Sequence, residues 1–380
     1  MTRMLYFIIM VSFLDTFIQL PIITPYALQL GASNILAGGI VAIYSLTNMV
    51  GNIIGGHWID RFGRKRMLFI GMFAASIILL LYPYAQTGEQ LFVIRFLHGL
   101  AGGVLIPAAF AYVGDQTSKR SRGKAMAITG ACIGTAAIIG PAIGGIMAAR
   151  SEVEYVFVLV AVLFFITTLL LLKFVKESFS ETERSAVSIK HFMPLLKDPL
   201  LLQASLAAFA LMVSNGTLAF ALPLKVADMG MDSETTGLLL STFGIVALIV
   251  FLTPLNRMYD RFEPITLVVI GLCLIAFVHI MLNFTMNSTI GYVLMCVYGV
   301  GFAFVFPSMN KIVADASSKI DRGKAYGIFY AFFSFGAVAG SFISGAAAEI
   351  IGFPFSSSAT IMLAIGLFLL YFSRKTKRSL

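Results

Sequence analysis

Residues 115–125 read DQTSKRSRGKA, and the stretch returns at residues 315–325 as DASSKIDRGKA, an offset of 200 positions. Further landmarks repeat at the same offset: Asp60-Arg61-Phe62 with Asp260-Arg261-Phe262, Pro107 with Pro307, and Gly99, Gly140 and Gly145 with Gly299, Gly340 and Gly345. A chain that repeats itself at half its length indicates duplication, with each half forming one structural unit. In a membrane protein, two related halves favour a transporter that works at the seam between them.

The composition is typical of a helical membrane protein. Of the 380 residues, 59% are hydrophobic and 12% are charged, whereas about a quarter are charged in a soluble domain. Mean hydropathy is +0.92. We therefore predict an all-α polytopic membrane protein. Apolar spans of roughly 20 to 26 residues are expected at 4–28, 35–59, 67–86, 90–113, 125–148, 154–175, 199–224, 234–256, 264–284, 289–312, 325–349 and 353–373.

These twelve spans form two pseudo-symmetric six-helix bundles. We expect a first bundle at 1–175, a cytoplasmic linker at 176–198, and a second bundle at 199–380 that ends in a short basic tail. The charged linker is expected to be a solvated tether. The run Met4–Leu28 lacks a small-residue cleavage site, so it is expected to stay as the first span.

An enzyme is not expected, because no nucleophile–base set and no segment long enough for a soluble catalytic domain is found. No metal or cofactor is expected either. The three cysteines, Cys132, Cys273 and Cys296, lie inside apolar runs at unrelated spacings. Such cysteines are typical of core packing rather than of disulfides or metal ligands.

The net charge of +9 predicts a membrane orientation rather than a nucleic-acid partner. Of the 27 Lys and Arg, all but Arg95, Arg150 and Lys225 fall on the side that both termini share. Cytoplasmic loops carry the excess of basic residues, so both termini are expected in the cytoplasm of a cell-membrane protein. The basic side also attracts anionic lipid headgroups.

The loop between the second and third spans reads GHWIDRFGRKR at residues 56–66. Asp60 can pair with an arginine or with the positive N-terminus of a neighbouring helix, and such contacts would form in one conformation and break in another. The alternative is a loop that only sets topology. The string resembles the loop motif of the major facilitator superfamily. Its second-half copy keeps Asp260-Arg261-Phe262 and loses the Gly-Arg-Lys tail. The conformational latch is expected to comprise Gly56, Asp60, Arg61, Gly63, Arg64, Asp115 and Arg122.

Span five carries a glycine and proline motif made of Gly130, Gly134, Gly140, Pro141, Gly144 and Gly145. Pro141 removes a backbone hydrogen bond, so a bend is expected there. The pattern resembles the fifth-helix motif of the twelve-helix drug:proton antiporters, and that resemblance implies export. Span eleven has Ser341 in place of the proline.

Small residues recur every fourth position in spans five and eleven. The two stripes are Ala136, Gly140, Gly144 and Ala148, and Gly336, Gly340, Ser344 and Ala348. Small residues let helix backbones approach closely in a membrane. The stripes predict either static packing or a smooth sliding surface between the halves.

Asp15 and Arg95 are the candidates for proton coupling. Asp15 is the acidic residue in the middle of a span, and its counterpart at the offset of 200 is Asn215. Burial favours a protonated carboxyl group, whereas a nearby guanidinium favours the carboxylate. Arg95, followed by Gly99, resembles the superfamily's fourth-helix motif, whose arginine is implicated in proton coupling. The alternative is a permanently ionised structural pair.

Polar and aromatic residues inside the spans are candidates for a substrate cavity. His98 has a weaker claim than Arg95, because about 300° of helix rotation separates them. The candidates are Gln19, Asn48, His98, Asn215, Phe220, Tyr298 and Phe302.

The resemblance implies the major facilitator fold, alternating access, and proton-driven export of small amphiphilic compounds or drugs. The expected partners are a small-molecule substrate, protons and the lipid bilayer, with a monomer as the functional state. The alternative is a dedicated exporter of one endogenous compound, such as a metallophore, a sugar or an amino-acid derivative. A non-transporting receptor or lipid-handling scaffold is the rival from another class.

Overall fold

The computed structural model describes residues 2–116, 122–177, 193–316 and 322–378. Within these ranges the chain is helical and contains no strands. Eleven of the described helices are long and apolar enough to cross a membrane, and the count rises to twelve when one bent pair is taken as a single span. The predicted all-α polytopic fold is therefore confirmed.

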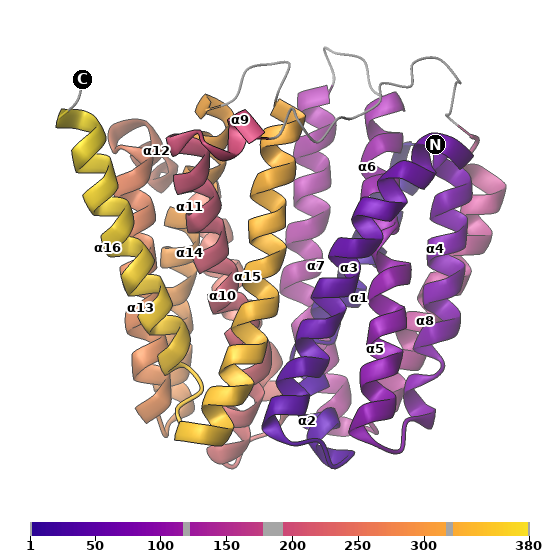
Figure 1. The fold of residues 1–380 in the computed structure, drawn as a ribbon. Coiled ribbons are helices and arrows are strands. Elements are labelled where there is room, and N and C mark those ends of the chain that lie inside the picture. Colours follow the sequence, from indigo (N-terminus) through magenta and orange to yellow (C-terminus); the bar gives the residue numbers. More distant parts are fainter. Residues whose placement is uncertain (1, 117–121, 178–192, 317–321, 379–380) are drawn as a thin grey trace. The chain divides into compact units, whose positions relative to one another are not determined.

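Contacts divide the chain into two compact units, Met1–Ser185 with Met231–Ser241, and Ala186–Gly230 with Thr242–Leu380. In each unit long helices run roughly parallel (Figure 1). The helices of the first unit are α1 (Thr2–Ile18), α2 (Ile23–Gln29), α3 (Asn34–Phe62), α4 (Arg64–Leu79), the 3-10 turn η1 (Tyr82–Tyr84), α5 (Gly88–Gly103), α6 (Leu105–Gln116), α7 (Arg122–Arg150) and α8 (Glu154–Phe174). α3 packs against α5, α1 against α7, and α4 against α8.

Helix α11 (Ser233–Leu252) contributes its first turns to the first unit and the rest to the second. The other helices of the second unit are α9 (Met193–Leu196), α10 (Pro199–Asp228), η3 (Pro254–Arg257), α12 (Met258–Arg261), α13 (Pro264–Phe284), α14 (Ser288–Ala316), α15 (Arg322–Ile351) and α16 (Ser356–Arg378). The main contacts join α10 to α15 and α13 to both α14 and α16.

The first span is broken rather than continuous over 4–28. The helices Met4–Ile18 and Ile23–Gln29 meet at 47°. Pro21 has no N–H to continue the ladder, and the backbone N–H groups of Ile22 and Ile23 both reach the Gln19 carbonyl, at 3.1 and 3.0 Å. Gln19 thus lies at the turn between α1 and α2.

Two other expected spans are also interrupted at prolines. The span over 90–113 divides at Val104 into α5 and α6, because Pro107 cannot donate to the carbonyl four residues earlier. The span over 234–256 ends as an α-helix at Leu252, just before Pro254 begins η3. The residue before a proline disfavours helical geometry.

The glycines of both small-residue stripes lie against helices of their own unit. A Cβ added to Gly140 would come within 2.9 Å of Phe17 Cβ, and one added to Gly144 would collide with the Ile18 carbonyl, both on α1. In the second unit, Gly336 lies against Phe209 and Gly340 against Val213, both on α10. Static packing inside each unit therefore accounts for these four glycines.

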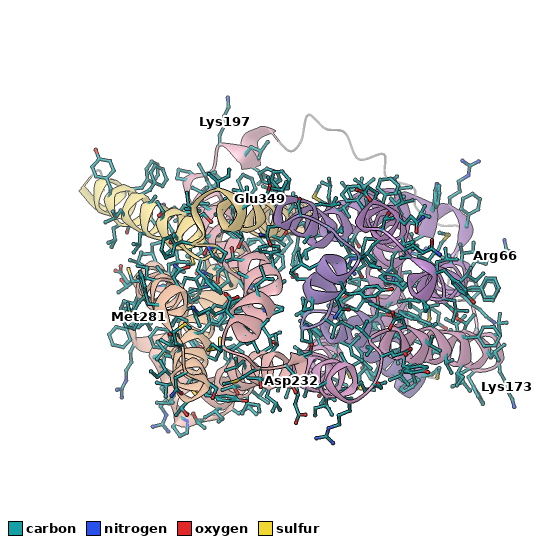
Figure 2. All side chains as sticks on the ribbon, turned by 90° about the horizontal axis from the view of Figure 1, so that it is seen from below. Arg66, Lys173, Lys197, Asp232, Met281 and Glu349 are labelled. Atoms are coloured by element: carbon teal, nitrogen blue, oxygen red, sulfur yellow. The ribbon has the colours of Figure 1, made fainter. Side chains whose placement is uncertain are left out.

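Large apolar side chains cover the outward surface of both units. Ile53 is 70% exposed, and Leu252 and Ile350 are each 75% exposed. Figure 2 shows the carbon-rich side chains around the helices, with Lys173 at the periphery of the first unit. A soluble monomer rarely exposes so much contiguous apolar surface, whereas lipid covers it in a membrane.

Candidate functional site

Asp15 is buried in α1 and is the centre of a polar network inside the first unit. Its side chain is 2% exposed. Gln19, one helical turn later, donates from Nε2 to Asp15 Oδ1 at 2.6 Å. The Tyr44 hydroxyl donates to Asp15 Oδ2 at 3.5 Å. A carboxylate at this depth in a membrane bundle needs such partners, because burying an unpaired charge is costly.

Arg95 reaches Asp15 through Gln19 rather than directly. Its Nη1 donates to Gln19 Oε1 at 2.7 Å, and its Nε donates to the Ile40 carbonyl at 3.4 Å. The guanidinium also lies over the Tyr44 ring, 4.3 Å from the centroid. A desolvated cation–π contact of this kind contributes about 2 kcal/mol. The two residues predicted for proton coupling are thus in one network.

The orientation of the Gln19 amide follows from its neighbours. Arginine has donors only, so the amide carbonyl must face Arg95 and the amide NH₂ must face Asp15. Turning the amide over would point NH₂ at a guanidinium. Gln19 therefore holds Asp15 Oδ1 as an acceptor and transmits the effect of the arginine to it.

His98 is a full member of the network, although the sequence argument ranked it below Arg95. Its Nε2 lies 3.2 Å from Asp15 Oδ2, and its Nδ1 lies 2.9 Å from the Tyr82 hydroxyl. A rotation of about 300° equals about 60° in the opposite sense, so residues i and i+3 share a helix face. His98 and Arg95 therefore lie on the same side of α5, and the weaker claim expected for His98 was wrong.

The contact between His98 and Asp15 has ion-pair distance without hydrogen-bond geometry. Nε2 is 3.2 Å from the carboxylate, yet it is a buried nitrogen with no hydrogen bond. At this distance the two groups attract each other electrostatically whenever the carboxyl group is ionised. The imidazole is 0% exposed, so no bulk water competes for this nitrogen.

Two tyrosines of the network, Tyr44 and Tyr82, were not predicted from the sequence. Tyr44 is on α3, and its ring meets the His98 ring edge-on at 5.2 Å. Tyr82 is in η1, is fully buried, and stacks on Phe157 at 4.3 Å. A tyrosine buried in an apolar span usually has a partner for its hydroxyl, and that rule is the signal that could have found them.

The second unit contains a neutral polar cluster. The Ser214 hydroxyl donates to the Tyr298 hydroxyl at 2.8 Å and lies 3.1 Å from His279 Nε2, while Ser358 contacts His279 Nδ1. Asn215 Nδ2 donates to Tyr298 at 3.5 Å. Tyr298, at the offset of 200 from His98, makes an edge-on contact with Phe243 at 5.2 Å, as His98 does with Tyr44.

The remaining cavity candidates make contacts of other kinds, and the Phe302 ring lies 5.7 Å from the Phe243 ring that also contacts Tyr298. Asn48 accepts a hydrogen bond from Asn52 at 3.0 Å. Phe220 is fully buried in α10, and Phe302 stacks on Phe306 with centroids 5.4 Å apart. Their contact with a substrate stays a prediction. In the motif of span five, Pro141 lies inside the continuous helix α7, and Gly130 and Gly134 lie on the same helix.

The loop between α3 and α4 is held by a carboxylate from the segment after α8. Gly63 has φ +96°, in the region that favours glycine. Glu177 Oε1 accepts from the backbone N–H of Arg64 at 2.9 Å and of Lys65 at 3.3 Å. A carboxylate at a helix N-terminus is stabilising. Glu177, expected in a solvated tether, thus caps α4.

The other latch candidates are only partly described. Arg64 Nη1 donates to the Ile59 carbonyl at 3.4 Å, and Arg61 lies over the Phe62 ring at 5.5 Å. The side chains of Asp60, Asp115 and Arg122, and the surroundings of Gly56, lie outside the described residues. The pairings predicted for them stay predictions.

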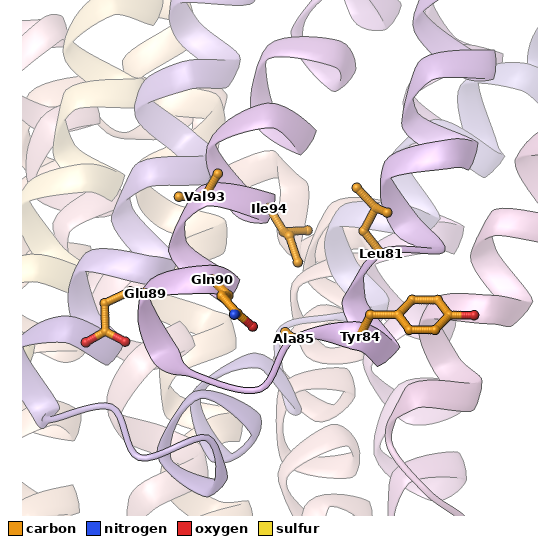
Figure 3. Close-up of a pocket in the computed structure, with 7 residues that line it drawn as sticks. All are labelled: Leu81, Tyr84, Ala85, Glu89, Gln90, Val93 and Ile94. Atoms are coloured by element: carbon orange, nitrogen blue, oxygen red, sulfur yellow. The ribbon is translucent and has the colours of Figure 1, made fainter.

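An open groove of about 520 Å³ lies beside η1 and the start of α5 (Figure 3). Its lining residues are Leu81, Tyr84, Ala85, Glu89, Gln90, Val93 and Ile94. None of the predicted cavity residues is among them. The buried network around Asp15 is therefore a separate feature.

The sequence matches the model of the Major Facilitator Superfamily over residues 5–224 and 204–380. The chain belongs to the major facilitator superfamily. The matched family and its relatives are a transporter family rather than an enzyme family. It is a multi-pass membrane protein.

Relatives within the superfamily carry drug-resistance names. The chain is 28% identical over 364 residues to Multidrug resistance protein 1 of Bacillus subtilis (strain 168), covering 94% of this chain and 92% of the relative. It is 26% identical over 345 residues to Multidrug resistance protein MdtG of Salmonella typhimurium (strain LT2), covering 88% and 85%.

Solved major facilitator structures show the same fold. A POT family transporter in complex with a thioalcohol-conjugated peptide superposes with a TM-score of 0.81 at 15% identity, covering 98% of this chain and 96% of the other. A bacterial homolog of the human lysosomal transporter Spinster superposes with a TM-score of 0.76 at 14% identity, covering 98% and 94%.

Proposed function

We propose that this chain is a proton-coupled antiporter that exports small amphiphilic compounds, chiefly lipophilic cations and drugs, across the cell membrane. The observation that carries the proposal is the buried Asp15, held between Gln19 and His98 in the first unit. An ionisable residue inside a membrane protein is by default a functional candidate. The drug-resistance names of relatives that span nearly the whole chain support the substrate class.

Asp15 has the surroundings that proton exchange needs. Gln19 donates to its Oδ1 and in turn accepts from Arg95, and the residue is 2% exposed. Loss of the proton leaves a negative charge that attracts a cation. A proton and a cationic substrate therefore compete for one carboxylate, which is the requirement for antiport.

A pH gradient alone can drive this exchange. Trading one proton for one monovalent cation moves no net charge, so the membrane potential does not contribute. Each unit of pH gradient then supplies about 1.4 kcal/mol, or about a tenfold concentration ratio. Alternating access of the two halves would carry the exchange. The latch residues and the bend at Pro141 are proposed to govern that movement in a functional monomer.

Transport in liposomes tests the coupling. Purified protein is reconstituted with an acidic interior, the membrane potential is clamped with potassium and valinomycin, and uptake of the lipophilic cation tetraphenylphosphonium is measured. We expect gradient-driven accumulation with the wild type and none with Asp15→Asn. The proposal would be overturned if uptake were the same with and without the pH gradient and the same in Asp15→Asn as in the wild type.

A control shows that the variant is folded. Exchange of labelled for unlabelled tetraphenylphosphonium requires binding and alternating access but no net proton movement. Asp15→Asn lacks the negative charge proposed to hold the cation, so its exchange is expected to fall as well, and thermal unfolding in detergent close to that of the wild type is the sign that it is folded. A dedicated exporter of one metabolite would instead show neither activity with this cation in the wild type.

A further inference from the structure

Two arms of hydrogen-bonding side chains lead to the two oxygens of Asp15, one from Arg95 and one from Tyr82. The first runs through Gln19 to Oδ1. The second runs from the Tyr82 hydroxyl, which lies 2.9 Å from His98 Nδ1, through His98 Nε2 to Oδ2. All five side chains are nine-tenths or more buried. The two arms differ in how easily the donors and acceptors along them can exchange roles.

The glutamine arm is locked. Reversing it requires the Gln19 amide to turn over, which would set its NH₂ against the donors of Arg95. A proton that neutralises Asp15 therefore binds on Oδ2, the oxygen that faces His98 and Tyr44.

The tyrosine–histidine arm can reverse without moving heavy atoms. An ionised Asp15 needs a hydrogen on the Nε2 that faces its Oδ2, which leaves Nδ1 to accept from the Tyr82 hydroxyl. A neutral imidazole then carries its hydrogen on Nε2, towards Asp15. This arrangement satisfies an ionised Asp15.

We propose that His98 shares the transported proton with Asp15 and that Tyr82 sets the tautomer of His98. The inference rests on the proposed function. One proton added to the pair gives either a carboxylic acid at Oδ2 facing a bare Nε2, or a carboxylate facing an imidazolium. In both forms Nδ1 carries a hydrogen, so the Tyr82 hydroxyl turns from donor to acceptor. Only O–H and N–H bonds form and break, and the proton leaves when the cation binds.

The helices packed against α1 and α5 carry other charged and titratable groups. Tyr44 on α3 contacts Asp15, and Tyr26 on α2 donates to the Tyr82 carbonyl at 2.7 Å. Arg150 at the end of α7 faces Glu234 at 3.4 Å, and Glu154 begins α8. The Asp115 side chain, on α6, lies outside the described residues.

Nitrogen NMR tests the tautomer without a substrate. The protein contains four histidines, and His98→Gln identifies the ¹⁵N signals of His98 in lipid-reconstituted protein. At alkaline pH we expect the tautomer with hydrogen on Nε2, and at acidic pH a hydrogen on Nδ1. His279, which contacts serines at both ring nitrogens, is the internal control. A hydrogen on Nδ1 at every pH would overturn the proposal.

Transport provides the second readout. Tyr82→Phe leaves the Nδ1 hydrogen of the protonated pair without an acceptor. The protonated pair is then less stable, so the curve of uptake plotted as a function of pH is expected to shift by about one pH unit towards acid. His98→Gln keeps a donor to Asp15 but cannot accept the proton, and gradient-driven uptake at neutral pH should fall at least about tenfold with exchange retained. Tyr84→Phe, the same change at an exposed site, is the matched control.

The outcomes separate this inference from the proposed function. If Asp15→Asn abolishes coupling while Tyr82→Phe and His98→Gln leave the pH profile in place, His98 is only a packing residue and the inference fails. If Asp15→Asn keeps full coupling, the proposed function fails whatever the NMR shows. Equal loss of exchange and of gradient-driven uptake in both variants would mean a structural role and would also overturn the inference.

Discussion

At the scale of the residue, Gln19 decides how Asp15 and Arg95 act on each other. A direct contact between Arg95 and Asp15 would have been a buried salt bridge. The intervening amide keeps the arginine one side chain away while it still supplies a donor to Oδ1. Gln19 is 1% exposed, so neither of its partners can turn to bulk water instead. The glutamine therefore moderates the influence of a strong cation.

Removing this bridge is expected to destabilise the first unit. Gln19→Leu leaves Arg95 Nη1 and Asp15 Oδ1 without the buried partner that Gln19 gives each of them, which should lower the free energy of unfolding by about 2 to 4 kcal/mol. Denaturation of the purified protein in detergent measures the change. Gln90→Leu, at an exposed glutamine, is the control and should cost less than about 1 kcal/mol. Equal costs would show that the bridge does not stabilise the unit.

At the scale of the element, the helix pairs α1–α7 and α10–α15 are held by close backbone approach. Gly144 lies against the Ile18 carbonyl, and Gly340 lies against the Val213 carbonyl. Lipid supplies no hydrophobic drive between helices, so such contacts supply packing energy instead. Gly140, which lies against Phe17 of α1, is the counterpart of Gly340 at the offset of 200, so both units keep this packing, whereas Asp15 and Asn215 differ.

Two alanine substitutions in α7 separate packing from helix propensity. Gly144→Ala places a methyl group on a backbone carbonyl and is expected to lower the melting temperature by several degrees, as about 1 to 3 kcal/mol of overpacking would. Gly134→Ala meets nothing within 4 Å, so it should leave the melting temperature unchanged or raise it slightly. Thermal unfolding in detergent tells them apart, and similar shifts for both would contradict the packing argument.

At the scale of the whole molecule, the distribution of basic residues predicts the orientation in the membrane. Lys65 lies at the start of the third span on the basic side, and Tyr84 lies near the opposite end of that span. With Cys132, Cys273 and Cys296 replaced by alanine, Tyr84→Cys in intact cells should react with a membrane-impermeant thiol reagent, whereas Lys65→Cys should react only after lysis. Labelling of Lys65→Cys from outside would invert the topology.

The sequence alone was enough for the fold class, because hydropathy, the repeat and the basic loops depend on local composition and on order along the chain. It also singled out Asp15 and Arg95, since a charge inside an apolar span stands out at once.

Other features were not foreseen from the sequence. They are the breaks in spans one, four and eight, the cap that Glu177 supplies, and the network members Tyr44 and Tyr82. The cap and the network join residues far apart in the chain: 29 positions separate Asp15 from Tyr44 and 76 separate Gln19 from Arg95. Only packing brings such residues within reach. The repeat at 115–125 and 315–325 indicates two related units, and folding determines which side chains lie beside Asp15 in the first.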